Sequence, residues 1–139
     1  MIELENETAY KVPLTALEKI ASALSEKEIE LLFVDDATMQ EINAQQRNID
    51  TTTDVLSFPY LDMPLLGSIV ISVDYAERGS EKFGHSVDDE VQLLFIHGLL
   101  HLMGFDHEVD SGEMRAKEAA LIEQFQLPKS LIVRTQEGI

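Results

Sequence analysis

The alternation of hydrophobic and polar positions predicts a chain that mixes strands and helices. Short runs that alternate, or that are wholly apolar, predict strands over residues 2–5, 28–34, 55–60 and 67–72. Helical spacing of apolar residues predicts helices over residues 13–23, 37–46 and 74–83, a central helix from Ser86 to Gly104, and a last helix from Asp110 to Leu127. The tail from Lys129 predicts no element. We therefore expect an α+β (mixed α/β) fold: one domain over residues 1–139, with about four strands in a mixed sheet and about five helices.

Local signals refine two of these elements. Asp36 is the expected N-cap of the helix over residues 37–46, which turns Met39 and Ile42 inward. A turn over residues 61–66 joins two strands that are close enough in the chain to form a hairpin.

The central helix is apolar nearly all round from Val91 to Met103, which predicts that it is buried. It carries His97 and His101, four residues apart and therefore about 40° from each other around the helix. Gly104 is expected to end the helix in a left-handed conformation, so that His107 can turn back toward the pair. One such histidine is more often a hydrogen-bonded core residue, but three crowded together in an apolar region favour a shared metal ion.

The spacing His-x3-His-x2-Gly-x2-His is that of the metzincin zinc proteases, with one difference. Gly98 stands where those enzymes carry the glutamate that acts as general base. The sequence therefore predicts a protease-like set of ligands without the proton acceptor of a protease.

Composition limits the alternatives. The chain has no cysteine, so a metal must be held by His, Asp or Glu. Its net charge of −16 argues against an RNA ligand unless a local basic cleft or a protein partner overrides the average field. The acidic N-terminus does not resemble a signal peptide, and no apolar run is long enough to span a membrane, so we expect a soluble cytoplasmic protein with no membrane partner.

Two blocks of sequence carry a specific resemblance. The segment from His97 to His107, and the segment Thr53-Asp54-Val55-Leu56-Ser57-Phe58-Pro59 preceded by Arg47, closely resemble the signatures of the YbeY family of bacterial rRNA-maturation factors. Members of that family are described as metal-dependent single-strand endoribonucleases. Gly67, Phe83-Gly84-His85-Ser86, Glu113-Met114 and Glu118 also fit, so the resemblance covers most of residues 45–120.

The resemblance implies a compact mixed α/β fold, one zinc ion on His97, His101 and His107 with a position left for water or substrate, and processing of the 3′ end of 16S rRNA. The implied partners are single-stranded rRNA on the small ribosomal subunit, together with ribosomal or assembly-factor proteins. Arg47 matches the functionally important arginine of the family. Ser68, Gln46 and Phe105 depart from residues common in the family, and Ser68 could change hydrogen bonding around the metal.

The resemblance suggests a mechanism in which zinc activates water and Arg47 holds the phosphate. The alternative for Arg47 is a surface ion pair with Asp50 or Asp54. Asp106 is either a base or, as we favour, an acceptor for the N–H of a ligating imidazole. His85 is either a group at the cleft rim or, as we favour, a solvent-exposed residue before the helix cap. We expect Thr51–Thr53 to cap their own loop.

Two other functions remain open from the sequence. One is a metzincin-like metallohydrolase acting on another substrate, which the missing base opposes. The other is a non-catalytic assembly factor in which zinc braces the fold, which would agree with the acidic surface.

Overall fold

Four strands form one mixed sheet in the order β1-β2-β4-β3. The structure is a computed structural model that describes residues 1–61 and 64–137. The strands are β1 (Ile2–Asn6), β2 (Glu28–Val34), β3 (Val55–Pro59) and β4 (Leu65–Ser72). β2 is parallel to β1 and β4, whereas β3 is antiparallel to β4, which confirms the predicted hairpin. The predicted turn over residues 61–66 includes Asp62 and Met63, which lie outside the described residues.

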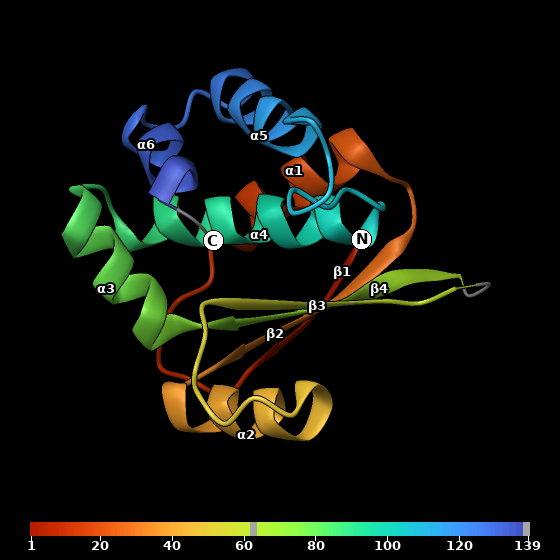
Figure 1. Cartoon of the computed structure of the whole chain (residues 1–139), viewed down its shortest axis with the longest axis vertical. Helices are drawn as coiled ribbons and strands as arrows, with labels where there is room; N and C mark the ends of the chain where they lie inside the picture. The colour runs from red at the N-terminus through yellow and green to blue at the C-terminus, as the bar shows by residue number, and fades with distance from the viewer. Residues whose placement is uncertain (62–63, 138–139) are drawn as a thin grey trace.

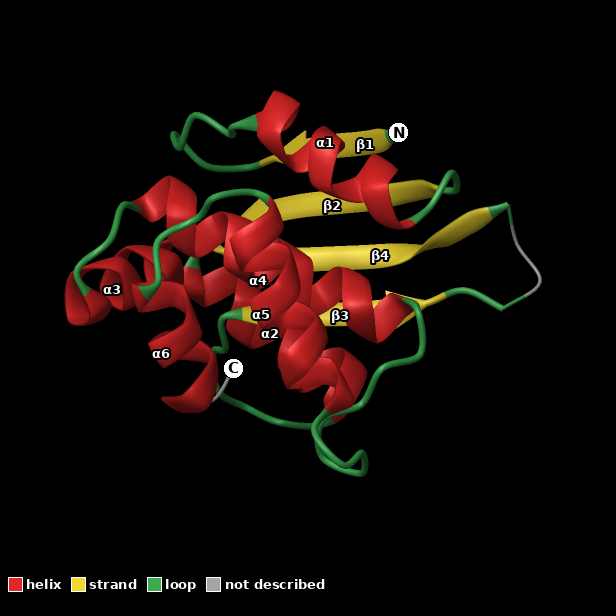
Figure 2. Ribbon diagram, turned by 90° about the horizontal axis from the view of Figure 1, so that it is seen from above, coloured by secondary structure: helices red, strands yellow, loops and turns green. Residues whose placement is uncertain are grey.

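Helices cover both faces of this sheet (Figure 1). They are α1 (Leu14–Leu24), α2 (Asp36–Arg47), α3 (Val73–Phe83), α4 (Val87–Leu102), α5 (Glu113–Gln124) and α6 (Ser130–Glu137). α2 lies on one side of the sheet, and α1, α4 and α5 lie on the other. Seen from above, α1 lies beside β1 and β2, while α4 and α5 lie toward β4 and β3 (Figure 2). Within the described ranges, no helix has the length and hydropathy that crossing a bilayer requires.

Alternating side chains of the inner strands build two cores. Ile29, Leu31 and Phe33 of β2, with Ile69 and Ile71 of β4, belong to the large core cluster that also contains the apolar residues of α1 and α4. On the opposite face, Leu56, Val70 and Val34 pack with Met39 of α2. The sheet is therefore buried on both faces around β4. α4 lies against β4 and against β3, the strand that forms one wall of the candidate functional site.

The structure corrects the predicted helices in two places. Residues from Lys129 onward are not a plain tail, because α6 buries Leu131, Arg134 and Thr135. The expected cap Asp36 was wrong by one residue: the Asp35 side chain accepts the Thr38 N–H at 2.8 Å, and Asp36 is already helical. The Asp36 carboxylate instead accepts hydrogen bonds from Ser72 and Arg78, and so joins α2 to the start of α3.

Candidate metal centre and cleft

The histidines are positioned by the two ends of α4. The Ser86 side chain accepts the Asp89 N–H at 3.0 Å and starts the helix, as predicted. At the other end, Gly104 has φ 98°, the left-handed conformation expected of it, and its N–H donates to the His101 carbonyl. The Phe105 N–H donates to the Leu100 carbonyl, which tightens the turn. The chain therefore reverses over a few residues and brings His107 back beside the helix.

Three imidazoles meet at this turn. One ring nitrogen from each of His97, His101 and His107 lies within 4.8 Å of the others. The Nε2 atoms of His97 and His101 are 3.1 Å apart. Two nitrogens bound at ~2.1 Å to one tetrahedral zinc ion would be roughly 3.4 Å apart, so this spacing suits a shared ion.

A carboxylate of α5 fixes the orientation of the His97 ring. Its Nδ1–H donates to Glu118 Oε1 at 2.8 Å, and Glu118 is fully buried. Arg115 Nη1 donates to the other oxygen of the same carboxylate at 3.3 Å. Because Nδ1 carries the proton, the lone pair of His97 is on Nε2, the nitrogen that faces His101.

Two further features of the histidines suit a metal ion. Burial, followed by the charges of the other two imidazoles, lowers the pKa of His101 and favours the neutral form that can ligate. Nδ1 of His107 is buried without a hydrogen-bond partner among the described residues. Buried polar atoms of this kind normally have a partner, so the arrangement is one that an ion would complete.

Close packing, rather than the chemistry of the site, explains the glycine at position 98. A Cβ atom built there would lie 3.0 Å from Ile69 Cγ2 and 3.1 Å from Ser57 Oγ. The Ser57 hydroxyl also donates to the Gly98 carbonyl at 3.2 Å. β3 and β4 therefore pack directly on α4 at this position, where a metzincin would carry its glutamate.

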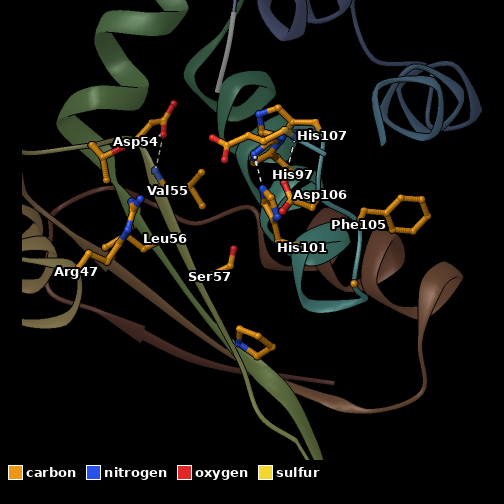
Figure 3. A pocket seen from close by; sticks show the side chains of 14 residues that line it. Arg47, Asp54, Val55, Leu56, Ser57, His97, His101, Phe105, Asp106 and His107 are labelled. Carbon is orange, nitrogen blue, oxygen red and sulfur yellow. Dashed lines mark hydrogen bonds between the residues drawn. The ribbon is translucent and has the colours of Figure 1, made fainter. Parts of the chain in front are cut away.

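The triad opens into a cleft of about 470 Å³ between β3 and the α4 turn. Arg47, the last residue of α2, lines the same cleft across from the histidines, with Ser57 between them (Figure 3). Its side chain is exposed and makes no ion pair with any described residue. The expected alternative partners are engaged elsewhere, since Gln40 donates to Asp50 and Arg134 binds Asp54.

A buried ion network holds the strand wall of the cleft. Arg134 of α6 donates from Nη2 to Asp54 Oδ2 at 2.8 Å and from Nε to Glu90 Oε2 at 2.9 Å. Asp54 also accepts the N–H of Val55, the first residue of β3, at 2.8 Å. Burial disfavours the charged guanidinium, but the Glu90 and Asp54 carboxylates outweigh it and raise the pKa of Arg134. Sequence reasoning missed this residue because a lone arginine after a short apolar run gives no signal of burial.

Several other expectations are revised. Asp106 lines the cleft and accepts the Glu108 N–H at 3.0 Å, whereas the carboxylate on His97 is that of Glu118. Glu118 belongs to the family resemblance, but its place in a helix with other glutamates gives no signal that it faces the triad. His85 is not exposed: its side chain is 1% accessible, with Nε2 2.7 Å from Glu90 Oε1 and Nδ1 2.8 Å from Ser130 Oγ.

The structure also shows where Ser68 and the threonine loop lie. Ser68 lines a separate cavity with glutamates of β1 and β2 and is not among the residues that line the cleft, so nothing among the described residues supports the expected effect on hydrogen bonding around the metal. Thr52 Oγ1 donates to Asp36 Oδ1 at 3.1 Å, and the Thr51 carbonyl accepts from the Asn43 side chain, so this loop is tied to α2.

Comparison with known proteins agrees with this site. The family model described as Endoribonuclease YbeY matches residues 2–126. The Endoribonuclease YbeY of Sulfurimonas denitrificans is 57% identical over 138 residues, which is 98% of this chain and 99% of that protein. The Endoribonuclease YbeY of Campylobacter jejuni is 62% identical over 124 residues, covering 87% of this chain and 92% of that protein.

A solved structure shares the fold. The solution structure of TM1509 from Thermotoga maritima superposes with a TM-score of 0.65 at 26% identity, covering 90% of this chain and 89% of that one. The family model ends at residue 126, so α6 and its Arg134 lie beyond the part that it matches. With a match over nearly the whole chain and relatives more than half identical, this chain belongs to the endoribonuclease YbeY family.

Proposed function

We propose that this protein is a zinc-dependent, single-strand-specific endoribonuclease that matures the 3′ end of 16S rRNA and contributes to ribosome quality control. The observation that carries the proposal is the sharing of one cleft by three converging imidazoles and Arg47. The relatives named Endoribonuclease YbeY support the same class of reaction, hydrolysis of an ester bond in RNA.

His97, His101 and His107 would hold the metal, leaving a position open toward the cleft. A zinc ion there would supply Lewis acidity and lower the pKa of a bound water to around 7. Glu118 keeps the Nε2 of His97 free to ligate by holding the proton on Nδ1.

Arg47 would bind the phosphate of the substrate. It is a free guanidinium on the wall that faces the imidazoles, and a planar guanidinium can donate two parallel hydrogen bonds to phosphate oxygens. Positive charge at that place would also offset the charge that develops on the phosphate in the transition state.

The proposed partners are single-stranded rRNA on the small ribosomal subunit and ribosomal or assembly-factor proteins, which would place the protein in the cytoplasm. Because the net charge is −16, contacts with the phosphate backbone must come from local cations such as Arg47 rather than from the average field.

The test is cleavage of a labelled single-stranded RNA that carries the 3′ end of 16S rRNA, by zinc-loaded wild type, His97→Ala and Arg47→Ala. Gln45→Ala, an exposed neighbour on α2, serves as the matched control. We expect His97→Ala and Arg47→Ala to lose cleavage. Arg47→Ala should keep its zinc, and Gln45→Ala should behave as wild type. Equal cleavage by all four preparations would identify a contaminating nuclease and end the proposal.

Two further measurements separate the other candidate functions. Removing the metal with a chelator should abolish cleavage while the circular dichroism spectrum persists; loss of the fold together with activity would favour a bracing role for zinc. Casein should remain intact, because Gly98 supplies no carboxylate in the place of the metzincin base.

A further inference from the structure

A second cavity adjoins the cleft. It measures about 410 Å³ and shares Thr53 and Asp54 with the cleft as lining residues. Its other walls come from one side of α3 and from α6; we call it the α3 cavity, lined by Tyr75, Arg78, Lys82, Phe83 and Arg134. Its volume lies within the range of about 300–1,000 Å³ that is usual for ligand sites.

The α3 cavity gathers cations in a protein that has few of them. The chain has 10 Lys and Arg against 26 Asp and Glu, yet Arg47, Arg78, Lys82 and Arg134 all line the cleft or the α3 cavity. Arg134 is committed to Glu90 and Asp54. Arg78 and Lys82 are the cations of the α3 cavity that can face a ligand.

Arg78 and Lys82 differ in their ion pairs, and this difference decides which of the two to mutate. Arg78 donates from Nη1 to Asp36 at 2.7 Å, but 54% of its side chain remains exposed. Lys82 is exposed and forms no ion pair with the residues that the structure describes. The carboxylates that line the cavity are Asp54, which Arg134 neutralises, and Glu137.

Both cations lie over aromatic rings. The guanidinium carbon of Arg78 is 4.9 Å from the centre of the Tyr75 ring, and Lys82 Nζ is 5.2 Å from the centre of the Phe83 ring. A groove that combines cations with aromatic rings is the usual means of binding single-stranded nucleic acid without sequence preference. The cations contact phosphates, and aromatic or guanidinium planes stack with bases.

We propose that the α3 cavity binds the single-stranded RNA segment that continues out of the cleft past Thr53 and Asp54, with Arg78 and Lys82 contacting its phosphates. This inference rests on the proposed function and deepens it, because it names where an acidic protein holds the flanking part of its substrate. Arg47 binds at the reacting phosphate, and the α3 cavity supplies affinity away from it.

Lys82 is the residue to change, because removing it breaks no ion pair of the described chain, whereas Arg78 also holds Asp36. The experiment measures kcat and KM of the zinc-loaded protein on a trinucleotide and on a dodecanucleotide of single-stranded RNA. The variants are Lys82→Ala and Lys82→Glu, with Lys82→Arg as the conservative change. Lys19→Ala is the matched control, since Lys19 is also an exposed lysine on a helix but lines neither cavity.

We expect Lys82→Ala to raise the KM for the dodecanucleotide several-fold, Lys82→Glu to raise it further, and Lys82→Arg to restore it. The kcat, and the KM for the trinucleotide, should not change. Removing one phosphate contact should also lower the slope of log KM against log salt concentration by about 0.7. Unchanged KM for the dodecanucleotide in Lys82→Glu, or equal changes for both substrates, would overturn the proposal while leaving the nuclease function standing.

If wild type cuts neither substrate, a measurement of RNA binding tests this proposal independently of the nuclease function. Fluorescence anisotropy of a labelled dodecanucleotide then decides: weaker binding by Lys82→Glu than by Lys19→Ala supports the α3 cavity, and equal binding overturns it. Thermal unfolding of each variant shows that the fold is retained.

Discussion

Arg134 Nη2 and Asp54 Oδ2 lie 2.8 Å apart, although 80 positions separate the two residues in the chain. The pair ties the last helix to the residue that precedes β3 and borders both the cleft and the α3 cavity. The position of the strand wall opposite the histidines thus depends on a helix that makes no contact with the proposed metal.

Arg134→Met should destabilise the protein by about 3–5 kcal/mol, because it removes the guanidinium that pairs with the buried carboxylates of Glu90 and Asp54. Urea unfolding at neutral pH measures the loss. Lys129→Met, at an exposed position just before α6, should stay within about 0.5 kcal/mol of wild type. A loss in Arg134→Met as small as that of the control would show that the network contributes little.

Glu118→Gln should weaken zinc binding by roughly 10- to 100-fold, because the neutral amide no longer strengthens the basicity of His97. Competition with a chromophoric chelator gives the affinity. Glu123→Gln, an exposed glutamate on the same helix, is the control and should bind zinc as wild type does. Equal affinities for the two variants would remove Glu118 from the support of the site.

Gly98→Glu should cost about 3–5 kcal/mol or more, because a charged side chain would be buried against Ile69 and Ser57. It should therefore not create a protease, although it completes the metzincin motif. Chemical unfolding and a casein assay check the two parts. Gln92→Glu on the same helix provides the comparison and should fold normally; a stable Gly98→Glu protein that cleaves casein would contradict this account.

Asp36 should contribute to acid sensitivity. Partial burial raises its pKa, but hydrogen bonds from Arg78, Ser72 and Thr52 lower it more, so the folded pKa is below the unfolded one. Its stabilisation is therefore complete above the unfolded pKa of about 3.9 and is lost as the pH falls through the lower folded value.

Asp36→Asn should lower the free energy of unfolding at pH 7 by about 0.5–1.5 kcal/mol, because the Arg78 pair is partly exposed, and the difference from wild type should shrink below about pH 4. Unfolding curves across this range, with Glu41→Gln on the exposed face of α2 as control, give the answer. If the difference in free energy of unfolding stayed constant with pH, the effect would come from side-chain packing rather than from the charge of Asp36.

The parts of the fold that sequence predicted are those with strong local signals. The four strands follow from their apolar runs, and α4 follows from its cap at Ser86 and its apolar surface. The convergence of the histidines was predicted from their spacing and from Gly104, which favours the left-handed conformation of the turn. The family resemblance was confirmed, while the roles of individual site residues remain predictions.

The parts that sequence missed depend on contacts between distant segments. Glu118 looks like any surface glutamate of a helix until α5 packs on α4 and points it at His97. His85 was expected to be exposed because it lies just before the cap of α4, yet Glu90 and Ser130 hydrogen-bond its ring. α6 was missed because its buried side includes Arg134 and Thr135, which interrupt the apolar period.

The sheet order also decides which part of the chain is enclosed when β2 and β4 pair. β4 lies between β2 and β3, and the 30 residues from 35 to 64, which include α2 and β3, connect the end of β2 to the start of β4. Closing such long-range pairings is slow, because their entropy is lost before contacts compensate for it. Arg47, at the end of α2, and β3, which forms the strand wall, both lie within this connection, so the pairing of β2 with β4 closes the loop that carries one side of the cleft.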